Sequence, residues 1–122
     1  MIAVFFADGF EEGEGIVPVD LLRRAGLEVK TVSITDSNQV IGSHNIPVTA
    51  DLIWDEFVVS DYDTLVLPGG LRGTENLSNF TPLHAVINSH FASGKLCCAI
   101  CAAPTLFGKL GILNGKNYTC FP

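Results

Sequence analysis

Cys101 stands where an apolar run meets a stretch of small residues. The run Leu96–Ile100 precedes it, and Ala102-Ala103-Pro104-Thr105, the opening of a helix, follows it. A buried strand followed at once by a helix forces a tight turn at the junction residue, as in the nucleophile elbow of hydrolases. A thiol on such a turn lies at a helix N-terminus, where free amide N–H groups favour the thiolate. The sequence therefore predicts a reactive cysteine at position 101.

One carboxylate is a candidate to exchange a proton with this thiol, and several backbone amides are candidates to form an oxyanion hole beside it. Gly69 and Gly70 follow a short apolar run, and their amides could form an oxyanion hole with that of Ala102. Glu14 lies in an acidic, glycine-rich stretch after the first apolar run. A protonated Glu14 would donate a hydrogen bond to the thiolate, whereas an ionised one would raise the pKa of the thiol. Reactivity therefore requires Glu14 and Cys101 to share a proton.

Other sites fit these residues less well. Cys98 and Cys101 form a C-x-x-C pattern, but Cys98 lies inside the expected strand and the chain offers no second pair of cysteine ligands. The acidic stretch lacks the alternating oxygen ligands of a calcium loop, and it lacks the third glycine of a dinucleotide site. We therefore expect neither a metal nor a cofactor.

The three histidines are His44, His84 and His90, and their spacing suggests no metal site. We expect His84 and His90 on an exposed helix face. The acidic neighbours Glu11 and Glu12 are expected to be structural or to face solvent.

Strands and helices alternate along the chain. Strands are expected in the apolar or alternating segments Ile2–Ala7, Leu27–Ile34, Thr64–Leu67 and Leu96–Ile100. Helices are expected over Ile16–Ala25, over Leu83–Phe91 with Thr81 as N-cap and Pro82 as first residue, and from the opening residue Ala102 to Leu110. Val40–Val48 fits an extended or hairpin segment, and Leu52–Val58 allows one helical turn. Alternation with apolar strands predicts a parallel sheet covered on both faces, with ligands at the carboxyl ends of the strands.

Composition narrows the class of protein. The chain has 122 residues, which we expect to form a single domain, and 48% of them are hydrophobic. A net charge of −6 disfavours nucleic acid and anionic membranes as partners. No apolar run approaches the roughly 20 residues of a membrane span, and the opening segment is too short for a secretory signal. Three of the four cysteines crowd into residues 97–101, so free thiols in the cytoplasm are expected.

The motifs together resemble the ThiJ/PfpI superfamily, in the branch of the parkinsonism-associated DJ-one protein and its bacterial ThiJ-like relatives. Glu11–Gly26 is similar to the family's opening helix region. Leu67-Pro68-Gly69-Gly70 and Ala99–Thr105 are similar to its other two signatures, in the same order and at compatible spacing. The resemblance covers essentially all 122 residues and implies a flavodoxin-like three-layer α/β sandwich with a mostly parallel sheet.

The resemblance also implies roles for particular residues. The family's oxidation-prone nucleophile falls on Cys101, its paired glutamate on Glu14, and its amide pocket on Gly70 and Ala102. Relatives form homodimers through the first helix, and a basic residue of the partner, matched here by His44, approaches the cysteine pocket. The implied activities are cofactor-free glyoxalase or deglycase chemistry on 2-oxoaldehydes or glycated thiols and amines. A redox-sensing or chaperone-like role through oxidation of Cys101 is the alternative, and the residues do not decide between enzyme and sensor.

Two features depart from the family's patterns. Ala102 stands where the protease-like branch has a histidine, and Phe121 precedes Pro122 where some relatives have one. We therefore expect no peptidase activity, and Glu14 would transfer protons alone. Family members also continue beyond the point matched by Pro122, so we expect the fold to be incomplete at its C-terminus and prone to association.

Overall fold

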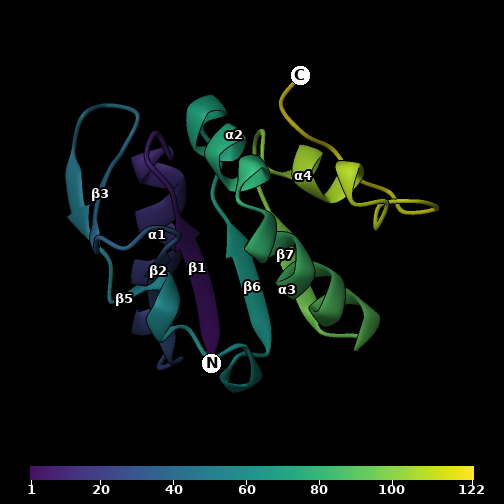
Figure 1. Cartoon of the computed structure of the whole chain (residues 1–122), viewed down its shortest axis with the longest axis horizontal. Helices are drawn as coiled ribbons and strands as arrows, with labels where there is room; N and C mark the ends of the chain where they lie inside the picture. The colour runs from purple at the N-terminus through teal and green to yellow at the C-terminus, as the bar shows by residue number, and fades with distance from the viewer.

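Five parallel strands form the central sheet of the computed structural model, which describes residues 1–122 (Figure 1). The strands follow the spatial order β5 (Leu52–Ile53), β2 (Val29–Ser33), β1 (Ile2–Phe6), β6 (Thr64–Leu67) and β7 (Leu96–Ala99). Every pairing in this sheet is parallel. The predicted parallel sheet is therefore confirmed, and the carboxyl ends of its strands lie along one edge.

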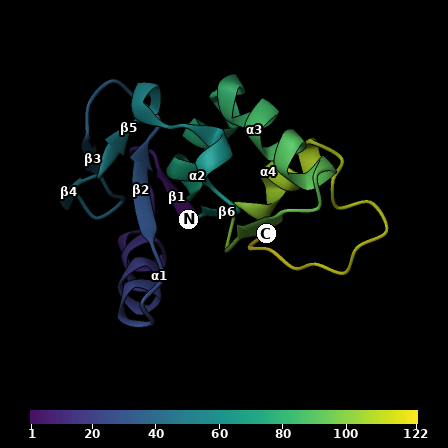
Figure 2. The ribbon, with the colours of Figure 1, turned by 90° about the horizontal axis from the view of Figure 1, so that it is seen from below.

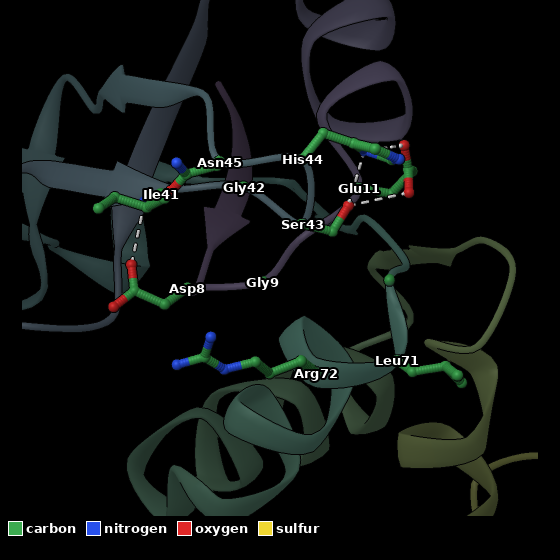
Figure 3. Close-up of a pocket in the computed structure, with 11 residues that line it drawn as sticks. Asp8, Gly9, Glu11, Ile41, Gly42, Ser43, His44, Asn45, Leu71 and Arg72 are labelled. Atoms are coloured by element: carbon green, nitrogen blue, oxygen red, sulfur yellow. Dashed lines mark hydrogen bonds and ion pairs between the residues drawn. The ribbon is translucent and has the colours of Figure 1, made fainter.

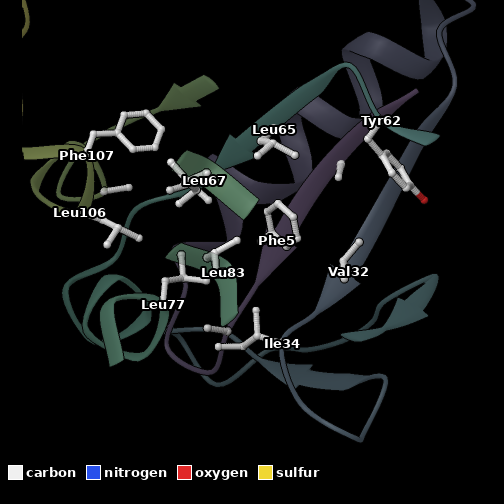
Figure 4. Close-up of a cluster of buried hydrophobic side chains, with 14 of the residues drawn as sticks. Phe5, Val32, Ile34, Tyr62, Leu65, Leu67, Leu77, Leu83, Leu106 and Phe107 are labelled. Carbon is white, nitrogen blue, oxygen red and sulfur yellow. The ribbon is translucent and has the colours of Figure 1, made fainter. Parts of the chain in front are cut away.

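Helices cover both faces of the sheet, as predicted (Figure 2). On one face lies α1 (Glu12–Arg24), and on the other lie α2 (Leu71–Asn79), α3 (Thr81–Ala92) and α4 (Pro104–Lys109). The larger core packs strand residues such as Phe5 and Leu65 against Leu77, Leu83 and Leu106 of these three helices (Figure 4). A smaller core on the α1 side is built from strand, loop, helix and hairpin residues: Val4, Phe6, Phe10, Val19, Val29, Val40 and Ala50.

A β-hairpin lies beside the sheet, as expected for the Val40–Val48 segment. It consists of β3 (Gln39–Ile41) and β4 (Pro47–Thr49), which pair antiparallel. The loop after β1 holds it in place, because the N–H of Gly9 donates to the carbonyl of Ile41 and the N–H of Ser43 donates to the carbonyl of Phe10. The segment after β5 forms two 3₁₀ turns, Trp54–Glu56 and Val59–Asp61.

The helices differ from the predictions in several places, and α4 begins at Pro104 rather than Ala102. Helix α1 begins at Glu12 rather than Ile16, so Glu14 lies in a first helical turn and not in a loop. Helix α2 was not predicted at all. Thr81 was wrongly expected to be the N-cap of α3: it is the first helical residue, and Phe80 is the N-cap without a side-chain hydrogen bond.

No helix of the structure is long and apolar enough to cross a membrane. The four cysteines are free thiols, and each is partly buried.

Candidate active site at the carboxyl ends of the strands

Cys101 occupies the turn between β7 and α4, where its backbone is left-handed. Its φ of 61° is one of two positive values outside glycine in the chain. A side chain in this conformation costs about 1 kcal/mol or more, so the surrounding structure must impose it. Helix α4 begins three residues later at Pro104. The tight strand-to-helix turn predicted for this position is confirmed.

Glu14 meets the Cys101 turn at Gly69. The Glu14 Oε2 atom accepts a hydrogen bond from the N–H of Gly69, with 2.9 Å between nitrogen and oxygen. A methyl group in place of the Gly69 hydrogen would overlap that carboxylate oxygen and lie 2.6 Å from Cβ of Cys101. Because Gly69 has no side chain, the carboxylate and the cysteine can both approach it closely. The structure thus brings Glu14, Gly69 and Cys101 together from three strand ends.

Three amides beside this cluster have no acceptor within the chain. The N–H of Gly69 is engaged by Glu14, whereas the N–H groups of Gly70, Cys101 and Ala102 donate to no protein group. Ala102 is only 4% exposed, and buried backbone donors are almost always paired. The arrangement is therefore suited to an anionic oxygen accepting from this turn.

The backbone of Gly70 requires a glycine. Its φ is 91°, and a Cβ there would lie 2.6 Å from the N of Glu11 and from the carbonyl oxygen of Gly9. Gly70 also precedes the first residue of α2, so its position is fixed by both a helix start and a close backbone contact.

His44 lies against the start of α1 in its own chain, next to Glu11 (Figure 3). Its Nδ1 atom is 3.1 Å from Oε1 of Glu12 and 3.3 Å from Oε1 of Glu11. The hydrogen bond with Glu12 and the negative charges of both carboxylates raise the pKa of His44 above its usual value. The expected approach of His44 to a partner's pocket stays a prediction.

Glu12 is buried and fixes the hairpin loop. Burial opposes its ionisation, but hydrogen bonds from its own backbone, from the ring and N–H of His44 and from the Ser43 hydroxyl lower the pKa of Glu12 to about 2. Together with Glu11 and His44 it places three potential cation ligands within 4.8 Å of one another. Because these ligand atoms already bond one another and Ser43, they explain the position of the loop without a cation.

A cavity of about 630 Å³ separates the hairpin loop from the start of α2 (Figure 3). Its walls come from the loop after β1, the hairpin and the start of α2: Asp8, Gly9, Glu11, Ile41, Gly42, Ser43, His44, Asn45, Gly70, Leu71 and Arg72. Gly70 lines this cavity, whereas Cys101, Glu14 and Ala102 do not. The cavity therefore reaches the amide-bearing turn after β6 but not the thiol itself.

The remaining cysteines and histidines have other roles. Burial raises the pKa of the Cys97 and Cys98 thiols, and the negative charge of Cys98 raises that of Cys97 further. The prediction that His90 is exposed was wrong: it is 2% exposed, and its Nε2 atom is 2.9 Å from the carbonyl oxygen of Tyr62. A backbone carbonyl partner has no signature in sequence, which is why the burial of His90 was missed.

Comparison with known proteins gives the following similarities. A sequence model of the DJ-1/PfpI family matches residues 1–122. Protein DJ-1 homolog B of Arabidopsis thaliana is 40% identical over 117 residues, which are 95% of this chain and 27% of the plant protein. Deglycase TK1284 of Thermococcus kodakarensis is 33% identical over 118 residues, 97% of this chain and 70% of the archaeal protein.

Solved structures agree with the sequence comparison. The structure of oxidized Toxoplasma gondii DJ-1 superimposes with a TM-score of 0.89 at 35% identity, covering 99% of this chain and 66% of that one. The chain spans less than two thirds of the length of several relatives that it matches. For example, it covers 64% of protein dj-1beta from Drosophila melanogaster.

Proposed function

This chain belongs to the DJ-1/PfpI family, and from that premise we propose that it performs cofactor-free chemistry on reactive 2-oxoaldehydes, with Cys101 as nucleophile and Glu14 as proton carrier. One observation supports this above the others. Glu14 and Cys101 meet at Gly69, beside the unpaired N–H groups of Gly70 and Ala102. The archaeal relative named a deglycase supports the same class of substrate.

The proposed reaction begins with attack of the Cys101 thiolate on the aldehyde carbon. A carbon–sulfur bond forms, the carbonyl electron pair moves to oxygen, and the N–H groups of Gly70 and Ala102 stabilise the oxyanion. The Glu14 carboxylate then takes the proton from the carbon that carries sulfur and returns it to the neighbouring carbon. The negative charge thereby moves to the oxygen of the neighbouring carbon, which takes up the proton lost by the thiol, and the hemithioacetal becomes a thioester. Water then releases the 2-hydroxy acid and the free thiol. No external oxidant or reductant is needed.

A direct test measures conversion of methylglyoxal to lactate by the intact chain. We expect turnover by the wild type, turnover below detection for Cys101→Ala, and wild-type turnover for Cys98→Ala, which removes a neighbouring thiol on β7. Equal turnover by wild type and Cys101→Ala would reject the proposal.

A redox sensor is the second candidate, favoured by the relative whose solved structure is described as oxidized. In this role Cys101 would be oxidised by a hydroperoxide, and Glu14 and the nearby amides would hold the oxidised sulfur. The methylglyoxal test separates the two candidates, because a sensor shows no turnover while Cys101 still reacts with peroxide.

A homodimer through α1 is also proposed. Ile16, Val17 and Leu21 on this helix are 41%, 53% and 59% exposed, and apolar side chains gathered on one helix are suited to burial against a second copy. We expect a dimer by light scattering and a smaller species for Leu21→Glu. A monomeric wild type would contradict this assignment.

A further inference from the structure

The C-terminal segment returns to the Cys101 turn after leaving α4. Figures 1 and 2 show it, in yellow, looping out from the helix and back toward the end of β7. The N–H of Phe121 donates to the carbonyl oxygen of Cys101, with 2.6 Å between nitrogen and oxygen. Cys120 directly precedes Phe121. Its free thiol therefore belongs to a residue next to the Cys101 turn.

The backbone contact limits how far apart the two cysteines can be. Covalent geometry places each Cα within about 2.5 Å of the hydrogen-bonding atom of its own peptide unit, so the Cα atoms of Cys101 and Cys120 lie at most roughly 7.5 Å apart. Any bend along this path shortens the separation. Disulfides form at Cα separations of about 4.4–6.8 Å. The upper bound on the Cα separation is close to this range, so the backbone hydrogen bond holds the two cysteines near disulfide distance.

The segment that carries Cys120 is also free to adjust. Residues 117–120 make no hydrogen bond to the rest of the chain, and Phe121 is the first residue after Lys116 whose N–H is bonded. Few such bonds mean a low cost of local rearrangement. Cys97 and Cys98, by contrast, are fixed in β7, where their backbones pair with β6.

We infer that Cys120 is a resolving thiol for Cys101. The Cys101 thiolate attacks a hydroperoxide oxygen and the O–O bond breaks, giving a sulfenic acid and an alkoxide or hydroxide, which takes up the proton lost by the Cys101 thiol as the alcohol or water. The Cys120 thiolate then attacks the Cys101 sulfur, forming the S–S bond and expelling hydroxide, which takes up the proton lost by Cys120 as water. The peroxide is reduced by two electrons and the two thiols are oxidised to one disulfide.

This disulfide would protect and regulate the same site. The inference rests on the proposed function only in taking Cys101 as the reactive thiol. With its sulfur bonded to Cys120, Cys101 can neither attack an aldehyde nor be oxidised irreversibly to the sulfinic acid. A small-molecule thiol would reverse the bond by exchange and restore the thiolate.

The test treats the 122-residue chain with two equivalents of hydrogen peroxide, enough for a sulfinic acid to form, and measures intact mass and tryptic peptides. Cleavage after Lys95, Lys109 and Lys116 places Cys101 in peptide 96–109 and Cys120 in peptide 117–122. We expect the intact mass to fall by two hydrogen atoms and the two peptides to be joined until a reducing agent is added. Cys120→Ser should instead gain oxygen on peptide 96–109, and Cys98→Ser should form the linked pair like the wild type.

Two results would overturn the inference. One is a wild type that gains two oxygen atoms at Cys101 with no linked peptides, as a sulfinic acid requires. The other is a loss of two hydrogens that persists in Cys120→Ser. Both are distinguishable from failure of the proposed function, because disulfide formation without methylglyoxal turnover rejects only the enzyme, and turnover without the disulfide rejects only the resolving thiol.

Discussion

The carboxylate of Glu14 accepts the N–H of Gly69 at 2.9 Å, joining the first turn of α1 to the end of β6 across 55 positions of the sequence. The amide thereby fixes one carboxylate oxygen next to the Cys101 turn. In the proposed reaction the Glu14 carboxylate carries a proton between two carbons of the substrate. The hydrogen bond from Gly69 positions this carboxylate for that transfer.

Glu14→Gln should lower methylglyoxal turnover by about 10²–10⁴-fold, the range typical of losing a general acid–base group. The glutamine carbonyl can still accept the N–H of Gly69, so we expect an unchanged melting temperature. Lactate formation and thermal unfolding are the measurements. Glu28→Gln, at an exposed acid between α1 and β2, should leave both unchanged. Full activity in Glu14→Gln would remove Glu14 from the mechanism.

Gly69→Ala should abolish turnover, because the added methyl group overlaps the Glu14 carboxylate and presses on Cβ of Cys101. Gly13→Ala is the matched control: it lies one residue before Glu14, and no atom is within 4 Å of the added methyl group. In a helix, alanine is favoured over glycine by roughly 0.8–1 kcal/mol. We therefore expect Gly13→Ala to be active and no less stable, and an active Gly69→Ala would contradict the contact.

Iodoacetamide at about pH 8 should modify Cys101 before Cys97 and Cys98, because only thiolates react and burial raises the pKa of the two β7 thiols. Fragmentation of peptide 96–109 locates the modification. In Cys101→Ser the labelling rate of this peptide should fall roughly tenfold or more. An unchanged rate would show that the strand thiols are the reactive ones.

The contact between Glu12 and His44 should give stability a maximum at mildly acidic pH. The pKa of Glu12 lies near 2 when folded instead of 4.5, so its contribution is complete above pH 4.5 and is lost as pH falls toward 2. The pKa of His44 is raised above 6.5, so its contribution is complete below pH 6.5 and is lost as pH rises through the folded value.

Melting temperatures of wild type and Glu12→Gln across this pH range check that expectation. Their difference should be largest between about pH 4.5 and 6.5 and should shrink on both sides. Glu28→Gln again serves as the control for the loss of one negative charge at an exposed position. A difference for Glu12→Gln that does not change with pH would refute the linkage.

Cys101→Gly should be about 1 kcal/mol more stable than Cys101→Ala, since glycine adopts a φ of 61° without the cost that a Cβ carries. Urea unfolding of the two variants measures the difference, and neither can perform the thiol chemistry. If their stabilities are equal, the left-handed turn is not strained.

The sequence was sufficient to predict the strands and the turn at Cys101, because each has a recognisable local pattern of residue types. Strands β1, β6 and β7 were found because strands of parallel sheets have near-continuous apolar side chains. The turn at Cys101 followed from the order of strand, cysteine and small residues. These positions depend on local pattern and on the general topology of parallel sheets.

The missed features depend on contacts between distant residues. Helix α2 contains Gly73, a residue that intrinsic propensity disfavours in a helix, and a Cβ there would lie 2.6 Å from Cα of Phe10. Gly15 was assigned to a glycine-rich loop, although it lies in the first turns of α1. Because it has no side chain, the ring of Phe10 can pack against it, and a Cβ at Gly15 would lie 2.7 Å from that ring. Propensity alone penalises both glycines, so only tertiary packing explains why they are helical.

The convergence of Glu14, Gly69 and Cys101 has a consequence for how the chain folds. Each residue follows a different strand, and the loops that must close between them are long. Non-local parallel pairings of this kind form late and slowly, because loop-closure entropy is lost before the contacts are gained. The contacts among Glu14, Gly69 and Cys101 are therefore expected only after the strands have paired. During refolding, the appearance of Cys101 reactivity would mark completion of the sheet and not the earlier formation of helices.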